Sequence, residues 1–291
     1  MTQLFRAEWM KINGNRFVAG MLVWIFPVGA ITFLSLALIP AFASDVFKAQ
    51  VNANPPTWSM QTLLPWAVIN SFVTRLALIG FAADVFAGEY QRSMWKNLLP
   101  RRRRVPLILM KFFTMGVMVL LAFFLACVFS GIWSGFVVRT AGAPYETFGP
   151  NETFGDFART FGFNALVAYA SVLIAASFAA LGGIITRSIL GAVGVGAVFT
   201  IAEQGMLALL FMIGNLLQIP QIIGLYKFTP GYNLSNITSW ATSGTAYSLP
   251  PIDQYAGGGF SAETSLVLVL LWVIGLMALT VWLFRRQDIT T

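Results

Sequence analysis

Histidine is absent from this chain, and cysteine and charged residues are scarce. Without histidine the chain has no HExxH zinc motif, no histidine-ligated haem and no Ser–His–Asp triad. The one cysteine, Cys127, has no partner for an intrachain disulfide and leaves the redox compartment open. No glycine-rich phosphate loop ending in Gly-Lys-Ser/Thr occurs, so that route to ATP hydrolysis is missing. The sequence therefore predicts no metal and no cofactor.

Charged residues make up only 10% of the 291 residues, whereas 57% are hydrophobic and the mean hydropathy is +0.76. A soluble domain of this length needs far more charge to cover its surface. A helix that crosses a bilayer needs ~20 apolar residues. Stretches without Asp, Glu, Lys or Arg run over 17–44, 49–74, 112–138, 160–186, 204–226 and 264–284. The sequence therefore predicts an all-α polytopic membrane protein.

The positions of these runs and of the basic residues predict a topology. We expect six transmembrane helices, at about 17–40, 63–86, 106–138, 161–185, 189–217 and 263–284. The first is too long for a signal-peptide core and lacks a cleavage pattern, so it should remain as a span. With the N-terminus inside, the inner segments hold thirteen Lys and Arg residues, and the outer segments hold only Lys48, Arg139, Arg159 and Lys227. Because basic residues concentrate on the cytoplasmic side, both termini are expected there.

Two segments outside the predicted spans have their own character. Residues 1–16 form a predicted interfacial helix, in which Phe5, Trp9 and Ile12 share one face. The opposite face carries Arg6, Glu8 and Lys11. Residues 218–262, between the fifth and sixth spans, are long, polar and aromatic, and are expected to lie at the outer interface or to dip into it.

Residues 88–104, GEYQRSMWKNLLPRRRR, concentrate six basic side chains and one acidic one. The periodicity over 84–99 predicts a short cytoplasmic amphipathic helix that ends at Pro100. Its apolar face would hold Tyr90, Met94, Trp95 and Leu98, and its polar face Glu89, Arg92 and Lys96. One interpretation is a topological anchor, since each basic residue near an anionic leaflet contributes ~1 kcal/mol. An anchor does not require a two-faced helix, so we favour docking of a protein partner.

The interfacial N-terminal helix, the six spans and the Gly-Glu pair that opens the basic loop resemble the permease subunits of ABC transporters, in the type-2 (exporter-like) membrane family. Loops of that family typically carry a glutamate, a Thr or Ser, a Leu-Leu pair, a proline, an arginine and a lysine that enters the next span. The counterparts in this chain are Glu89, Ser93, Leu98, Leu99, Pro100, Arg101 to Arg104 and Lys111.

The resemblance implies that residues 1–291 form a single transmembrane permease domain, with 84–104 as its coupling segment. Such a subunit is not an enzyme, because two separate cytosolic ABC ATPase subunits dock on it and hydrolyse ATP. The residues that would contact them are Glu89, Arg92, Ser93, Met94, Trp95, Lys96, Leu98 and Leu99. The other implied partners are a second copy or a homologous permease and membrane lipids, without nucleic acid. The implied function is efflux across the cell inner (plasma) membrane, along a path lined by the second and fifth spans.

Two charged residues fall inside predicted spans, Arg75 in the second and Glu203 in the fifth. A charge near the bilayer centre costs ~2.5–3.5 kcal/mol on insertion scales, so each is expected to face protein or water. Either they line a polar translocation route, or they form a structural ion pair between helices. Both interpretations remain open from the sequence.

Two other functions compete with the ATP-driven exporter. An ion-gradient-driven secondary transporter could use Arg75, Asp84 and Glu203 as coupling groups, although no inverted repeat or paired helix breaks are evident. An intramembrane enzyme is disfavoured because the chain has no histidine and no acidic pair at helical spacing within one span.

Overall fold

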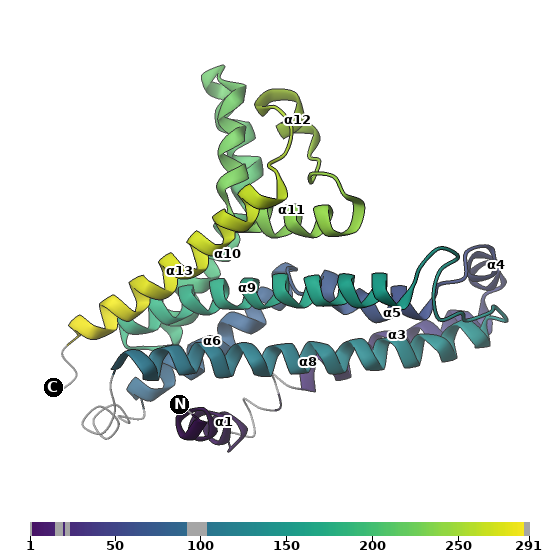
Figure 1. Ribbon diagram of the computed structural model, residues 1–291, viewed down its shortest axis with the longest axis horizontal. Coiled ribbons are helices and arrows are strands. Elements are labelled where there is room, and N and C mark those ends of the chain that lie inside the picture. Colours follow the sequence, from purple (N-terminus) through teal and green to yellow (C-terminus); the bar gives the residue numbers. More distant parts are fainter. Residues whose placement is uncertain (1, 15–19, 21–23, 92–103, 288–291) are drawn as a thin grey trace. The chain divides into compact units, whose positions relative to one another are not determined.

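The computed structural model describes residues 2–14, 20, 24–91 and 104–287, and this part of the chain contains helices but no strand (Figure 1). The helices in the first part of the chain are α1 (Thr2–Gly14), α3 (Ile25–Ala43), α4 (Asp45–Ala53), α5 (Trp58–Val68), α6 (Phe72–Gln91) and α8 (Arg104–Thr140). Those that follow are α9 (Phe154–Thr186), α10 (Ile189–Leu217), the 3-10 helix η2 (Pro220–Phe228), α11 (Pro230–Ser243), α12 (Pro250–Ala256) and α13 (Ala262–Arg286).

Five of these helices are long and apolar enough to cross a membrane, namely α3, α8, α9, α10 and α13. α5 and α6 meet the same criteria only when they are taken together across the break between them. The predicted all-helical membrane protein is therefore confirmed in its class. α10 begins and ends at the predicted residues, whereas the second predicted span, 63–86, is not one continuous helix.

The second predicted span is interrupted between Val68 and Phe72, after the proline of α5 and before the start of α6. Pro65 lies inside α5 and has no N–H to donate to the carbonyl of Gln61. The hydroxyl of Ser130 donates to that carbonyl instead, at 2.8 Å, so the freed acceptor remains satisfied. After the break, the Ser71 hydroxyl oxygen accepts from the backbone N–H of Thr74 at 3.3 Å and caps the start of α6.

The described chain divides into two compact units. One comprises Met1–Ile12, Asn70–Gly116 and Leu166–Thr291, and the other comprises Asn13–Ile69 and Val117–Ala165. α8 and α9 each contribute residues to both units. The expectation of a single permease domain remains a prediction.

In the first unit, small residues allow close packing of α10 against α6. The buried face of α10 carries Ala192, Gly196, Thr200, Glu203, Leu210 and Gly214. A Cβ atom at Gly196 would lie 2.5 Å from Cγ2 of Ile79 on α6, so only glycine fits there. Ala192 packs with Ala83 and Ala87 in a cluster of small side chains. This is the small-residue packing that membrane helices use when lipid offers no hydrophobic driving force.

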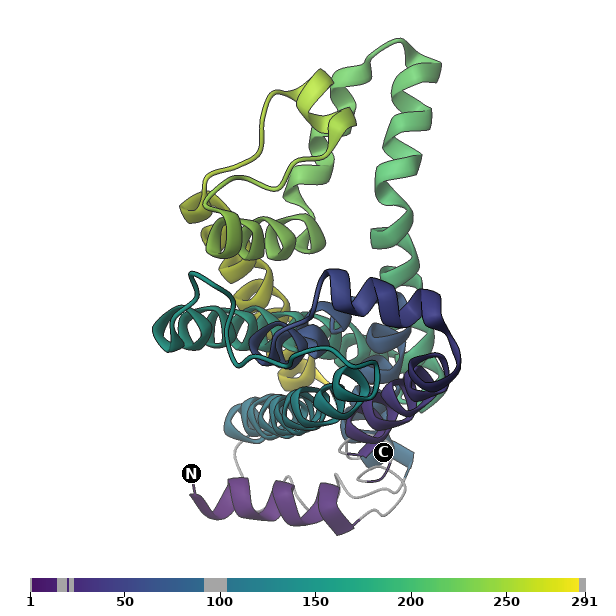
Figure 2. The same cartoon turned by 90° about the vertical axis from the view of Figure 1, so that its right-hand side faces the viewer.

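The segment between α10 and α13 returns through η2, α11 and α12 (Figures 1 and 2). The ammonium group of Lys227 in η2 donates to the carbonyls of Ala256, Gly257 and Gly258 at 2.7–2.8 Å. The buried amide of Asn236 in α11 donates to the carbonyl of Phe260 at 2.9 Å. These bonds hold the polar aromatic segment predicted at 218–262 as a folded element of three short helices.

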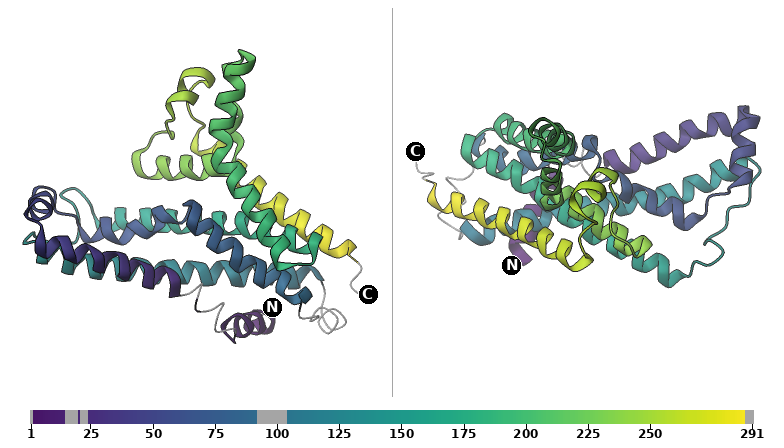
Figure 3. Two further views of the ribbon diagram at one scale, coloured as in Figure 1. Left: turned by 180° about the vertical axis from the view of Figure 1, so that it is seen from behind. Right: turned by 90° about the horizontal axis from the view of Figure 1, so that it is seen from above.

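In the second unit, α3 runs alongside α8 (Figure 3), where Ala41 packs against Val137. The start of α5 is fastened to the loop after α8, because the backbone N–H of Trp58 donates to the carbonyl of Glu146 at 2.8 Å. The hydroxyl of Ser59 also donates to the Glu152 carboxylate at 2.5 Å. α3 thereby packs near the C-terminal end of α8, and α5 is joined to the loop that follows α8.

Two glycines on α10 provide a matched test of the α6–α10 contact. Gly196→Ala should destabilise the protein by ~1–3 kcal/mol, because its Cβ overlaps Ile79. Gly194→Ala meets nothing within 4 Å and should be neutral or stabilise by ~0.5–1 kcal/mol, since alanine favours a helix interior. Thermal unfolding in detergent, followed by size-exclusion chromatography, measures both. Equal behaviour of the two variants would contradict the close packing.

Candidate functional site: buried charges beside the coupling segment

Lys111, near the start of α8, is completely buried and lies between two carboxylates. Its Nζ donates to Glu89 at 2.7 Å, to Glu8 at 3.0 Å and to the carbonyl of Val85 at 3.3 Å. These three acceptors match the three donors of an ammonium group. Lys11 also forms an ion pair with Glu89, so the cluster contains two carboxylates and two ammonium groups. Its formal charges cancel, which burial requires.

The cluster joins three helices of the same unit, because Glu8 and Lys11 lie on α1, Glu89 on α6 and Lys111 on α8. Phe5 of α1 adds an apolar contact, with its ring 5.8 Å from that of Phe113 on α8. The predicted N-terminal helix is present, but the assignment of Glu8 to its outward polar face is wrong, since Glu8 is only 4% exposed. The reason is that Glu8 pairs with Lys111.

Glu89 also differs from the sequence interpretation. We expected it on the polar face of a separate cytoplasmic helix over 84–99, but residues up to Gln91 continue α6 and Glu89 is 1% exposed. Asp84, on the same helix, is half-buried. The other predicted coupling residues lie outside the described residues: Arg92, Ser93, Met94, Trp95, Lys96, Leu98 and Leu99.

Residues 92–103 are flanked on both sides by residues that bind the end of α13. Before them, the Tyr90 hydroxyl donates to the side-chain oxygen of Gln287 at 2.5 Å. After them, the Arg104 guanidinium donates to the carbonyls of Phe284, Arg285 and Gln287 at 2.9–3.3 Å. An arginine here satisfies carbonyls that the helix end leaves without partners. Gln287 in turn donates to the carbonyl of Ile184 in α9 at 2.8 Å.

Arg75 and Glu203 form a second buried charge site in the same unit. They are joined by a salt bridge between α6 and α10, and their side chains are 6% and 4% exposed. The second carboxylate oxygen of Glu203 accepts from the backbone N–H of Gly231, at the start of α11. The partial positive charge of a helix N-terminus favours an anion there. The structure thus brings the two predicted residues together and adds the segment 218–262 as a third participant.

Gly231 approaches this carboxylate closely, because a Cβ atom there would lie 2.6 Å from Oε1 of Glu203 and would force that side chain to shift. Tyr226 of η2 also lies near this pair. Its partial burial raises the pKa of its hydroxyl, and the negative charge of Glu203 raises that pKa further. Glu203 therefore links α6, α10 and the segment that follows α10.

Sequence reasoning missed several residues of these sites. Lys111 was considered only as a motif counterpart, although a lysine seven residues into a long apolar helix is a signal that it is buried with a partner. Arg104 was counted as one of four consecutive arginines, and nothing in the sequence distinguishes it from its neighbours. Gly231 carries no sequence signal, since its role depends on the distant Glu203.

Lys111→Met should destabilise the protein by ~3–5 kcal/mol, because it leaves two buried carboxylates with one remaining cation. Lys48→Met is the matched control, since Lys48 is partly exposed and pairs only with the fully exposed Asp45. That variant should leave the unfolding temperature nearly unchanged. Thermal unfolding in detergent compares them. Limited proteolysis near residue 12 should also accelerate only in Lys111→Met, as α1 loses its attachment.

Arg75→Leu and Glu203→Leu should each destabilise the protein by ~3–5 kcal/mol, because the remaining charge keeps no ionic partner in a low-dielectric interior. The double variant should recover part of that loss. Unfolding temperature and folded yield in detergent measure the coupling as a double-mutant cycle. Strictly additive losses would contradict the ion pair.

A scan against protein-family models finds no match to this chain, and a search of curated proteins finds none either.

Proposed function

We propose that this chain is the membrane-spanning permease subunit of an ATP-driven ABC exporter, with six spans if α5 and α6 together form one. Cytosolic ATPase subunits dock on residues 84–104, and the two termini lie on the same, cytoplasmic side of the inner (plasma) membrane. A second copy or a homologous permease completes the transport path. The resemblance of the loop from Glu89 to Lys111 to that family, together with the basic residues that flank the predicted spans, supports this proposal.

The observation that carries the proposal lies in the described residues on either side of 92–103. Glu89, near the end of α6, belongs to the cluster of Lys111 and α1, and Arg104, at the start of α8, binds the end of α13. A partner that pulls on this segment therefore acts on α1, α6, α8 and α13 of one unit together. Loops that only anchor a protein to lipid headgroups do not require such attachment at both ends.

The Arg75–Glu203 pair bears on the competing ion-coupled transporter. A carboxylate that picks up and releases a coupling ion needs an accessible oxygen. Both oxygens of Glu203 are engaged, one by Arg75 and one by the N–H of Gly231, and the side chain is buried. This arrangement favours a structural or gating role for the pair over a role as an exchanging ion site.

The proposal predicts that a tryptophan in the coupling segment is needed for energy coupling. The complete protein is purified in mild detergent from its native membrane, its associated proteins are identified by mass spectrometry, and ATP hydrolysis is measured after reconstitution in vesicles. We expect an ATPase with a phosphate-binding loop to copurify. Trp95→Ala should remove most of that ATPase, or most of the hydrolysis that depends on the permease.

Trp282→Ala is the control, because Trp282 is a half-exposed tryptophan of α13, 4.1 Å from the Arg286 guanidinium and outside the coupling segment. It should retain the ATPase and its activity. Absence of such an ATPase, together with solute flux that follows an imposed ion gradient, would overturn the proposal and favour the secondary transporter.

A further inference from the structure

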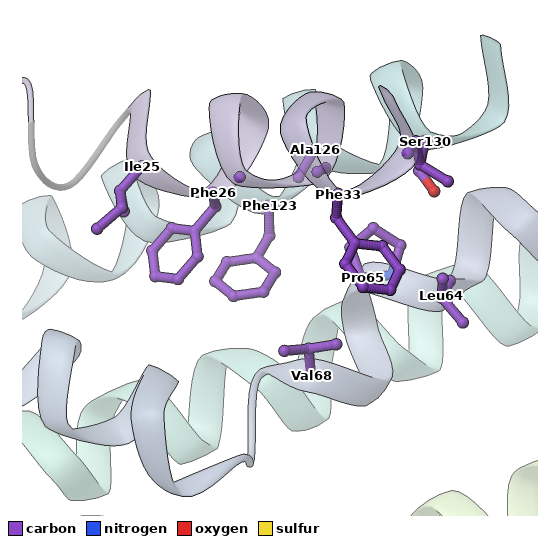
Figure 4. A pocket seen from close by; sticks show the side chains of 12 residues that line it. Ile25, Phe26, Phe33, Leu64, Pro65, Val68, Phe123, Ala126 and Ser130 are labelled. Carbon is purple, nitrogen blue, oxygen red and sulfur yellow. The ribbon is translucent and has the colours of Figure 1, made fainter. Parts of the chain in front are cut away.

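A cavity of about 380 Å³ lies within the second unit, between α3, α5 and α8 (Figure 4). Ligand pockets commonly measure ~300–1,000 Å³, so this volume is large enough for part of an organic molecule. Its lining comes from residues 25–34, 64–68 and 123–130. Pro65 is among the lining residues, so the proline-containing part of α5 helps to form the space.

The lining is almost entirely apolar. Of the lining residues only Ser130 has a polar side chain, and its hydroxyl already donates to the carbonyl of Gln61. A water molecule needs two to four polar partners to be held in a cavity, and this lining does not offer them. No lining residue carries a charge that would recognise an ionic headgroup. The chemistry of the cavity therefore suits hydrocarbon.

One side of the cavity is built from packed aromatic rings, with Phe26 and Phe123 at 4.4 Å between centroids. Trp66 stacks on the same Phe123 ring at 5.8 Å. The other lining residues include side chains that reach the surface, since Phe33 is 69% exposed and Val68 is 49% exposed. In Figure 4, Phe33 points down from the upper ribbon and Val68 points up from the lower ribbon, toward the space between them. The cavity thus has an apolar opening at the surface of α5 and of α3, and α3 is long and apolar enough to cross a membrane.

We propose that this cavity binds one hydrocarbon chain of a membrane phospholipid. The opening is lined by apolar side chains on α3 and α5, and the medium beside a membrane-spanning α3 consists of acyl chains. A chain that enters replaces a void with dispersion contacts to the Phe123 ring and its neighbours. The headgroup remains outside, which is consistent with a lining that contains no charge. This proposal does not depend on the proposed transport function.

Photolabelling of the full chain in vesicles tests the site. The vesicles consist of phosphatidylcholine with a trace of a phosphatidylcholine that carries a diazirine near the end of one acyl chain. After irradiation, labelled positions are mapped by mass spectrometry. We expect labels on lining residues of all three helices, such as Phe26, Leu64 and Phe123.

Gly29→Phe should block the cavity, because Gly29 lines it and a Cβ atom there meets nothing within 4 Å. Labelling of the lining residues should fall by more than half, while labelling of α13 stays the same. Gly275→Phe is the matched control, since Gly275 lies on the apolar helix α13 and is equally free of neighbours. It should leave labelling of the cavity unchanged. If Gly29→Phe does not fold, Val68→Phe at the opening replaces it.

Three outcomes would overturn the proposal. The first is labelling of the lining residues that is unchanged by the blocking variant. The second is labelling confined to outward positions such as those of α13, which would indicate general contact with lipid. The third is loss of the cavity label on addition of free oleate but not of unlabelled phospholipid, which would identify a free fatty acid as the occupant.

Discussion

The ammonium group of Lys111 is completely buried. Carboxylates on the surrounding helices must therefore balance its charge. Two carboxylates from two other helices do so, and α1 is held to the rest of its unit largely through them. Removing a charge from water costs several kcal/mol, which is recovered only if each donor and acceptor finds a partner. The requirement fixes the register of α1, α6 and α8 together, because a shift of one residue in any of them would separate the charges.

Glu203 is subject to the same constraint, that a buried charge needs partners. Its two oxygens face two different partners, the guanidinium of Arg75 and the first turn of α11. The carboxylate therefore holds the start of α11 against α10, and any side chain at 231 would force it to shift. The buried side chain of Glu203 thus takes part in the contact between the two long helices α6 and α10 and also positions the shorter helix α11.

Backbone groups inside apolar helices are subject to a related constraint. Pro65 leaves a carbonyl without a donor, and a serine from α8 replaces the missing hydrogen bond. Arg104 serves the final carbonyls of α13 in the same manner. Where α6 and α10 contact one another away from the Arg75–Glu203 pair, small residues bring the backbones close enough for dispersion contacts to accumulate.

The sequence by itself determined the helical membrane class, because long runs without charge leave no alternative to helices in lipid. The predicted bounds of α10, about 189–217, also agree with the structure, although Glu203 lies inside its apolar pattern. The periodicity along each helix assigns Glu8 and Glu89 to polar faces of exposed helices, and it does not reveal that the two side chains are buried. Only the tertiary structure decided that they are buried, because their burial depends on Lys111, a residue distant in sequence. The energy of an ion pair depends on distance in space, which a pattern along one helix does not contain.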